Sequence, residues 1–154
     1  MKLFDREPDD KFAVHILRAP MMALSQPDQG LGFPAGTTLI PRIFMRNAGA
    51  GAAQVSLSVD WRAENKTGSV APPPVVLSPG EVTVINLADQ QKSLQIPPDA
   101  TWGTVKLTYS GKRAELVAVA LSYDEDYRYG LQTPFSENLS HKWARRYVAC
   151  RCNA

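Results

Sequence analysis

The sequence predicts an all-β protein, a two-layer antiparallel β-sandwich of about seven to eight strands. Short segments in which apolar and polar residues alternate recur along the 154-residue chain, with turn-forming residues between them. The chain contains 12 prolines and 10 glycines, and one proline inside a helix costs about 3 kcal/mol. The alternation is clearest over residues 55–61, which predicts a strand with one buried and one wet face.

The first strand is expected over residues 12–17, and a loop that contains proline and glycine over residues 20–36. The next strand is expected over residues 37–47, which are apolar on both faces. Because Pro41 has no N–H for a ladder hydrogen bond, this strand should lie at a sheet edge there or carry a bulge. A linker of glycine and alanine follows over residues 47–53.

In the strand at residues 55–61, the residues that share one face are Val55, Leu57, Val59 and Trp61. A turn is expected at residues 65–68, and three prolines at residues 72–74 form a stiff connection. After a short strand at residues 75–77, proline and glycine occupy the two central positions of residues 78–81, which predicts a type II turn.

Two more strands are expected at residues 82–87 and 102–109. Residues 110–113 then close a hairpin onto a strand at residues 114–123. Because this last strand is apolar on both faces, it should be central in its sheet and covered on both sides.

The length favours a single domain. The expected division is an N-terminal tail (residues 1–11), the β-sandwich (12–134) and a C-terminal extension (135–154). In the extension, apolar residues recur four apart from Leu139 to Tyr147, which favours a short helix or a docked extension.

Composition excludes several classes of function. Lysine plus arginine number 17 against 15 aspartates and glutamates, so no clustered positive excess points to nucleic acid. No apolar run reaches the roughly 20 residues of a membrane span, and the N-terminus lacks the apolar stretch of a secretory signal. Cys150 and Cys152 lie one residue apart near the C-terminus, so the fold should not depend on a disulfide.

Several of these segments together resemble bacterial immunoglobulin-like sandwich domains, the fibronectin-III-like modules related to cell adhesion. They are Asn47 after a strand, the alternating strand at 55–61, Leu77-Ser-Pro-Gly-Glu81 and the segment 105–110. The resemblance covers roughly residues 37–123 and implies an immunoglobulin-like sandwich. It also implies an extracellular or periplasmic location if the chain is a module of an exported protein; otherwise we expect a cytoplasmic one.

The inventory for catalysis is thin, so we expect no enzyme and no cofactor. The two histidines, His15 and His141, lie at opposite ends of the chain, and His15 within a strand fits a surface or hydrogen-bonded histidine. Neither the nucleophile elbow of hydrolases nor a phosphate-binding or dinucleotide-binding glycine motif occurs.

Two weaker patterns could bind a ligand. Asp124 and Asp126 are spaced as calcium ligands could be, but the number of ligands is short, and charges that simply end an apolar strand explain them better. Tyr127 and Tyr129, with Trp102 elsewhere, could form a platform for a glycan, whereas tyrosines at strand ends also commonly pack on the core with the hydroxyl in water.

We therefore expect a non-catalytic interaction or spacer module. Its partner is a protein or a neighbouring domain, recognised by an exposed sheet edge or by the loops 20–36, 64–74 and 124–133. The alternative is a carbohydrate-binding accessory domain that uses the loop tyrosines.

Overall fold

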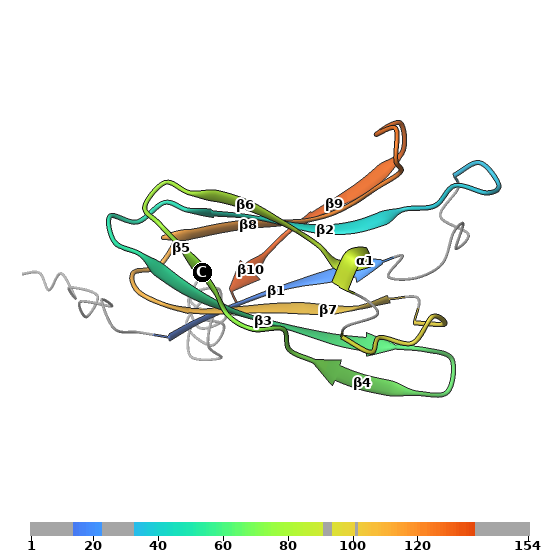
Figure 1. Cartoon of the computed structure of the whole chain (residues 1–154), viewed down its shortest axis with the longest axis horizontal. Coiled ribbons are helices and arrows are strands. Elements are labelled where there is room, and N and C mark those ends of the chain that lie inside the picture. Colours follow the sequence, from blue (N-terminus) through green and yellow to red (C-terminus); the bar gives the residue numbers. More distant parts are fainter. Residues whose placement is uncertain (1–13, 23–32, 91–93, 101, 138–154) are drawn as a thin grey trace, which may run out of the picture.

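The computed structural model is an all-β sandwich of two antiparallel sheets, which confirms the predicted fold class (Figure 1). It describes residues 14–22, 33–90, 94–100 and 102–137. Within these ranges, no helix is long and apolar enough to cross a membrane.

The six-stranded sheet has the order β10-β1-β7-β3-β4, and β5 also pairs with β3. Its strands are β1 (Val14–Met22), β3 (Ala53–Arg62), β4 (Thr67–Val70), β5 (Val75–Leu77), β7 (Trp102–Ser110) and β10 (Ser136–Glu137). The four-stranded sheet has the order β6-β2-β8-β9. Its strands are β2 (Ile40–Asn47), β6 (Val82–Asn86), β8 (Leu116–Tyr123) and β9 (Gly130–Pro134), and the short helix α1 (Leu87–Gln90) follows β6.

The core lies between the sheets and is built from rows of facing side chains. Leu17 of β1, Leu107 of β7 and Leu57 of β3 form one such row across the six-stranded sheet. From the other sheet, Ile43 and Met45 of β2 enter the same core and are fully buried. The alternation predicted for residues 55–61 therefore does place its apolar side on the core.

The hairpin predicted at residues 110–113 is wrong, because β7 and β8 belong to different sheets. The chain changes direction through residues with positive φ, Gly111 (151°) and Ala114 (64°). The Ala48 N–H then donates to the Glu115 carbonyl at 2.7 Å, which attaches the incoming strand to the β2 side of the molecule. The segment turns as expected, but it crosses from one sheet to the other.

Proline positions explain two further outcomes. The loop expected from residue 20 starts later, because β1 continues through Pro20 to Met22. After Arg18, β1 pairs with β7 on one side and has no paired strand on the other. Pro20 therefore lies at a local sheet edge, where its missing N–H is tolerated. Pro41 agrees with the expected local edge: β6 pairs with β2 only from Arg42 onward, and Pro41 faces β8 alone.

Other boundaries also shift. Parts of the expected loops 64–74 and 124–133 are the strands β4 and β9. Residues 136–137 of the expected C-terminal extension form β10 and pair with β1. The helix expected around Leu139 lies outside the described residues, as do Cys150 and Cys152.

The predicted type II turn at residues 78–81 is present. Gly80 has φ of 76°, and the Glu81 N–H donates to the Ser78 carbonyl at 3.0 Å. The Glu81 carboxylate also accepts the Ser78 N–H at 2.6 Å, so the turn is closed from both ends.

Asn47, at the end of β2, is a buried polar residue that joins the two sheets. Its Nδ2 donates to the carbonyls of Gly51 (2.8 Å) and Leu77 (3.0 Å), and its Oδ1 accepts the Gly49 N–H (2.9 Å). Its backbone carbonyl accepts the Gly80 N–H at 2.8 Å. The Asn47 side chain thus fixes the β2–β3 connection and the end of β5. Its backbone carbonyl fixes the turn before β6.

We predict that Asn47→Ala lowers the free energy of unfolding by about 2–3 kcal/mol, because it leaves two carbonyls and one N–H without a partner. Asn47→Asp should cost at least as much, since a carboxylate cannot donate to either carbonyl. Urea denaturation measures both. Asn86→Ala is the control: Asn86 accepts the Ala88 N–H at 2.9 Å at the exposed start of α1, and its loss should cost about 1 kcal/mol. Equal costs at the two positions would contradict this role of Asn47.

Candidate functional site

The outer face of the four-stranded sheet is apolar and uncovered by any described element. The prediction that β8 is central is confirmed, since it lies between β2 and β9. The prediction that both of its sides are covered is wrong: Val117 is 47% exposed, whereas the alternate residues Leu116, Ala118 and Ala120 are buried. Only one side of this apolar strand reaches the core.

Neighbouring strands extend this surface across the whole sheet. The strand register aligns Val84 of β6, Phe44 of β2, Val119 of β8 and Pro134 of β9 in one row. Val82 and Val84 are 50% and 52% exposed. We call this surface the outer apolar face, and its apolar members are Phe44, Val82, Val84, Val117, Val119, Leu121 and Pro134.

The charge on the outer apolar face is positive. Among the outward positions of the four described strands, Arg42 and Arg46 are charged and none is acidic. The Arg42 guanidinium lies 5.2 Å from the ring centre of Tyr127, and its Nη1 is buried without a hydrogen-bond partner in the described part of the chain. A buried N–H group without an acceptor is unfavourable.

The β8–β9 loop is organised by Asp124 at the end of β8. The Asp124 carboxylate accepts the Tyr129 N–H at 2.8 Å, and Arg128 Nε lies 3.5 Å from its other oxygen. The hydrogen bond from the Tyr129 backbone, helped by Arg128, lowers the pKa of Asp124 below its usual value. Asp124 therefore stabilises the conformation of the β8–β9 loop.

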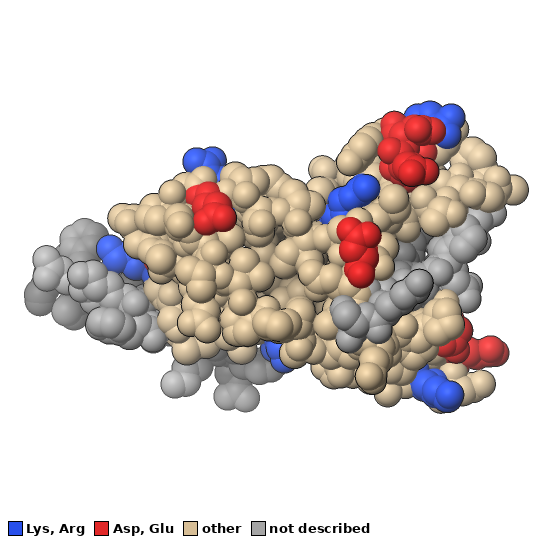
Figure 2. All heavy atoms as spheres, in the orientation of Figure 1, with Lys and Arg blue, Asp and Glu red and all other residues tan. Residues whose placement is uncertain are grey.

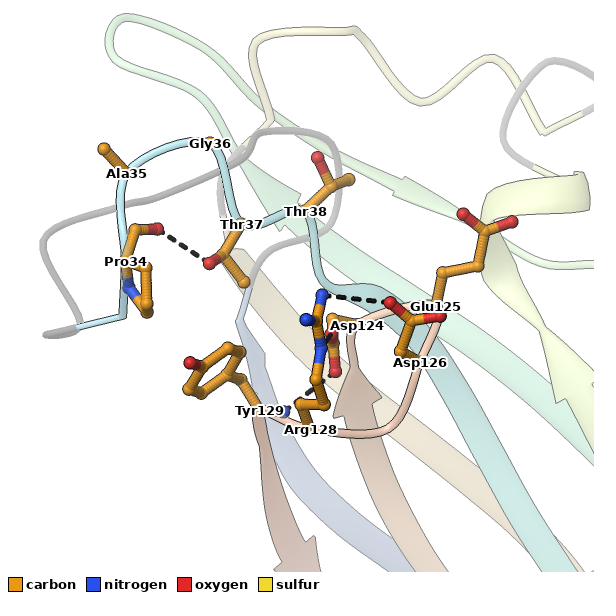
Figure 3. Close-up of a pocket in the computed structure, with 10 residues that line it drawn as sticks. All are labelled: Pro34, Ala35, Gly36, Thr37, Thr38, Asp124, Glu125, Asp126, Arg128 and Tyr129. Atoms are coloured by element: carbon orange, nitrogen blue, oxygen red, sulfur yellow. Dashed lines mark hydrogen bonds and ion pairs between the residues drawn. The ribbon is translucent and has the colours of Figure 1, made fainter.

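The loop and residues 34–38 border an open cleft of about 410 Å³ (Figure 3). Arg128 projects between Asp124 and Asp126, and its Nη2 lies 2.9 Å from Asp126 Oδ2. A bound calcium ion would have to displace this guanidinium from both carboxylates. Within the described ranges, no three His, Cys, Asp or Glu side chains are grouped to hold a metal ion.

The three aromatic residues proposed for a glycan platform point to different surroundings. Tyr127 has φ of 56°, and its ring lies 6.1 Å from that of Tyr123, towards the outer apolar face. Tyr129 faces Phe33, with ring centres 5.9 Å apart. Trp102 lies in the other sheet, at the start of β7, with Arg62 5.4 Å from its ring centre. The three residues line no common cleft.

His15 is buried and hydrogen-bonded at both ring nitrogens. Nδ1 lies 2.7 Å from Glu137 Oε1, and Nε2 lies 3.0 Å from the Gly111 carbonyl oxygen. Because both partners accept, the ring makes both bonds only when both nitrogens carry a proton. Burial, and then the Glu137 carboxylate, raise the pKa of the stacked Tyr109. This cluster holds β10 against β1.

Charge is scattered over the face shown in Figure 2, where lysines and arginines stand apart from one another and some of them lie beside aspartates or glutamates. This view therefore shows no basic patch of the kind that phosphate contacts require.

Sequence reasoning missed the outer apolar face. Two patterns in the sequence indicated this face: residues 114–123 are apolar on a second side, and valines occur at positions 82 and 84. A strand that is apolar on both faces was instead interpreted as fully buried. Burial of both faces would have needed a third layer, which the described residues do not form.

Comparison with known proteins shows the fold. No known family profile and no curated protein matches the sequence. The crystal structure of Thermotoga maritima 1070 is similar over 80% of this chain and 94% of that chain, with a TM-score of 0.52 and 13% identity. The Anabaena sensory rhodopsin transducer is similar over 68% of this chain and 93% of that chain, with a TM-score of 0.45 and 17% identity.

We predict that Asp124→Asn destabilises the protein at neutral pH and that this effect disappears in acid. Since folding lowers the pKa of Asp124, its contribution is present above the pKa of the unfolded chain, about 4, and is lost as pH falls through the lower folded value. Urea denaturation from pH 7 to pH 2.5 measures the difference between variant and wild type. Asp126→Asn is the control, because Asp126 is 68% exposed and should show little dependence. A difference that does not change with pH would contradict this role.

Proposed function

We propose that this chain is a non-catalytic protein-binding module, an immunoglobulin-like or fibronectin-III-like sandwich that docks a partner on its outer apolar face. The observation that carries the proposal is the outer apolar face, whose central apolar row crosses all four strands and on which Val82, Val84 and Val117 are about half exposed. Exposed apolar surface that spans a whole sheet is typical of interaction sites, because leaving it in water is unfavourable.

The charges of this face select the chemistry of the partner. Arg42 and Arg46 project from β2 among apolar neighbours, and the outward positions of the four strands contain no carboxylate. Two copies that met through this face would bring arginines towards arginines. The fitting partner is therefore an apolar protein segment that carries aspartate or glutamate, since carboxylates pair with guanidinium groups through two parallel hydrogen bonds.

The loops and sheet edges expected from the sequence are weaker candidates for partner binding than the outer apolar face. Asp124, Asp126 and Arg128 of the β8–β9 loop are engaged with one another, and residues 23–32 of the first expected loop lie outside the described residues. Recognition by loops or by a sheet edge stays a prediction, as does the extracellular or periplasmic location of an exported module.

The test is selection of a phage-displayed random peptide library on the immobilised full chain. Peptides enriched for apolar residues together with aspartate or glutamate are expected. Their binding should fall at least about tenfold with Val84→Glu, which places a charge in the apolar row, and with Arg42→Gln, which removes the cation. Val76→Glu is the matched control, because Val76 is a 63% exposed valine of β5 in the other sheet.

Three results would contradict the proposal. One is an enriched set without acidic residues, and another is binding that survives Val84→Glu. The third is found by analytical ultracentrifugation: a wild-type dimer that Val84→Glu dissociates would assign the face to a second copy of the chain.

A further inference from the structure

A separate groove of about 500 Å³ lies at one end of the six-stranded sheet, where β3, β4 and β7 run side by side (Figure 1). Its outward side chains form an array of two rows. One row is Ser69, Asp60 and Thr104, and the other is Thr67, Arg62 and Trp102. Adjacent strands are about 4.8 Å apart, and alternate residues of one strand about 6.7 Å apart, so the array measures roughly 10 Å by 7 Å.

The floor of the groove is held from the core side by Trp61. The register places Trp61 between Gly68 of β4 and Gly103 of β7. A Cβ atom at Gly68 would lie 2.4 Å from Trp61 Cζ2, so the indole occupies the space that a side chain would need there. Gly68 thus leaves room for the Trp61 ring beside the backbone that carries the array.

Trp102 presents a flat ring at the rim of this array. It is 50% exposed, and the Arg62 guanidinium carbon lies 5.4 Å from its ring centre, close enough for a cation–π contact that orients both side chains. Asp60 and Arg62 have no ion-pair partner among the described residues. One aromatic surface therefore stands beside a carboxylate, a guanidinium and three hydroxyls.

This combination matches the chemistry of a sugar. A pyranose has an apolar C–H face, which packs on an aromatic ring, and a rim of hydroxyls that both donate and accept. Asp60 accepts from such hydroxyls and Arg62 donates to them, while the threonine and serine hydroxyls do either. Because the two charges of the array are opposite, it favours a neutral sugar over an acidic or a basic one.

We infer that this groove binds a neutral hexose or pentose oligosaccharide, with one sugar ring stacked on Trp102 and its hydroxyls bound by Asp60, Arg62 and Thr104. The site lies in the other sheet from the outer apolar face and does not depend on protein binding there. Of the three aromatic residues that the sequence suggested for a glycan platform, this site includes Trp102 and excludes Tyr127 and Tyr129.

Isothermal titration of the full chain with cellohexaose, laminarihexaose, maltohexaose, mannohexaose and xylohexaose tests the inference, and tetragalacturonate serves as the acidic probe. Saturable binding of at least one neutral oligosaccharide is expected. Trp102→Ala and Asp60→Asn should each raise its Kd at least about tenfold. Both positions are exposed, and circular dichroism checks that the variants fold.

Tyr127→Ala is the matched control, since Tyr127 is an exposed aromatic residue (67%) outside the groove, and Val84→Glu controls for the outer apolar face. Both should leave the Kd unchanged. The inference is overturned if none of the five neutral oligosaccharides binds, if tetragalacturonate alone binds, or if Tyr127→Ala abolishes binding while Trp102→Ala preserves it. Loss of peptide binding with Val84→Glu leaves this site untouched, so the two proposals fail independently.

Discussion

The geometry of the sandwich depends on a buried amide at one end of it. Asn47 ends β2 of the four-stranded sheet, and its side chain donates to the Leu77 carbonyl at the end of β5, in the six-stranded sheet. Its other hydrogen bonds fix the connection that leads into β3. Because three backbone groups are satisfied by this one side chain, the layers are held at a fixed offset where the chain passes from one to the other.

Both proposed surfaces follow from the resulting register. In the four-stranded sheet, Ile43 and Met45 face the core, which leaves Arg42, Phe44 and Arg46 outward among the valines of β6 and β8. In the six-stranded sheet, Val59 and Trp61 face inward, so Asp60 and Arg62 face out beside Trp102. A slip of one residue would exchange the faces of a strand, and polar groups would then enter the core.

Local patterns predicted local structure well. Residues 55–61 form a strand because their alternation matches a sheet with one wet face, and residues 78–81 form a type II turn because Gly80 accepts a positive φ. Long-range choices were not visible. The residues at 110–113 favour a reversal, but nothing in them says whether the next strand joins the same sheet or the opposite one. The groove was missed for a related reason: its six outward residues come from three strands, and only pairing brings them together.

The order in which strands enter the two sheets has a consequence for folding during synthesis. β7 lies between β1 and β3, so the six-stranded sheet stays split until β7 has been made, and in the four-stranded sheet the β2–β6 pair waits for β8 and β9. During synthesis, residues up to Glu137 must leave the ribosome before all strands of both sheets can pair. Until then, several unpaired strand edges and the apolar faces of β1, β2 and β3 are open to other nascent chains. Such long-range pairing folds slowly, and a ribosome-associated chaperone that covers these edges would raise the yield of the native sandwich.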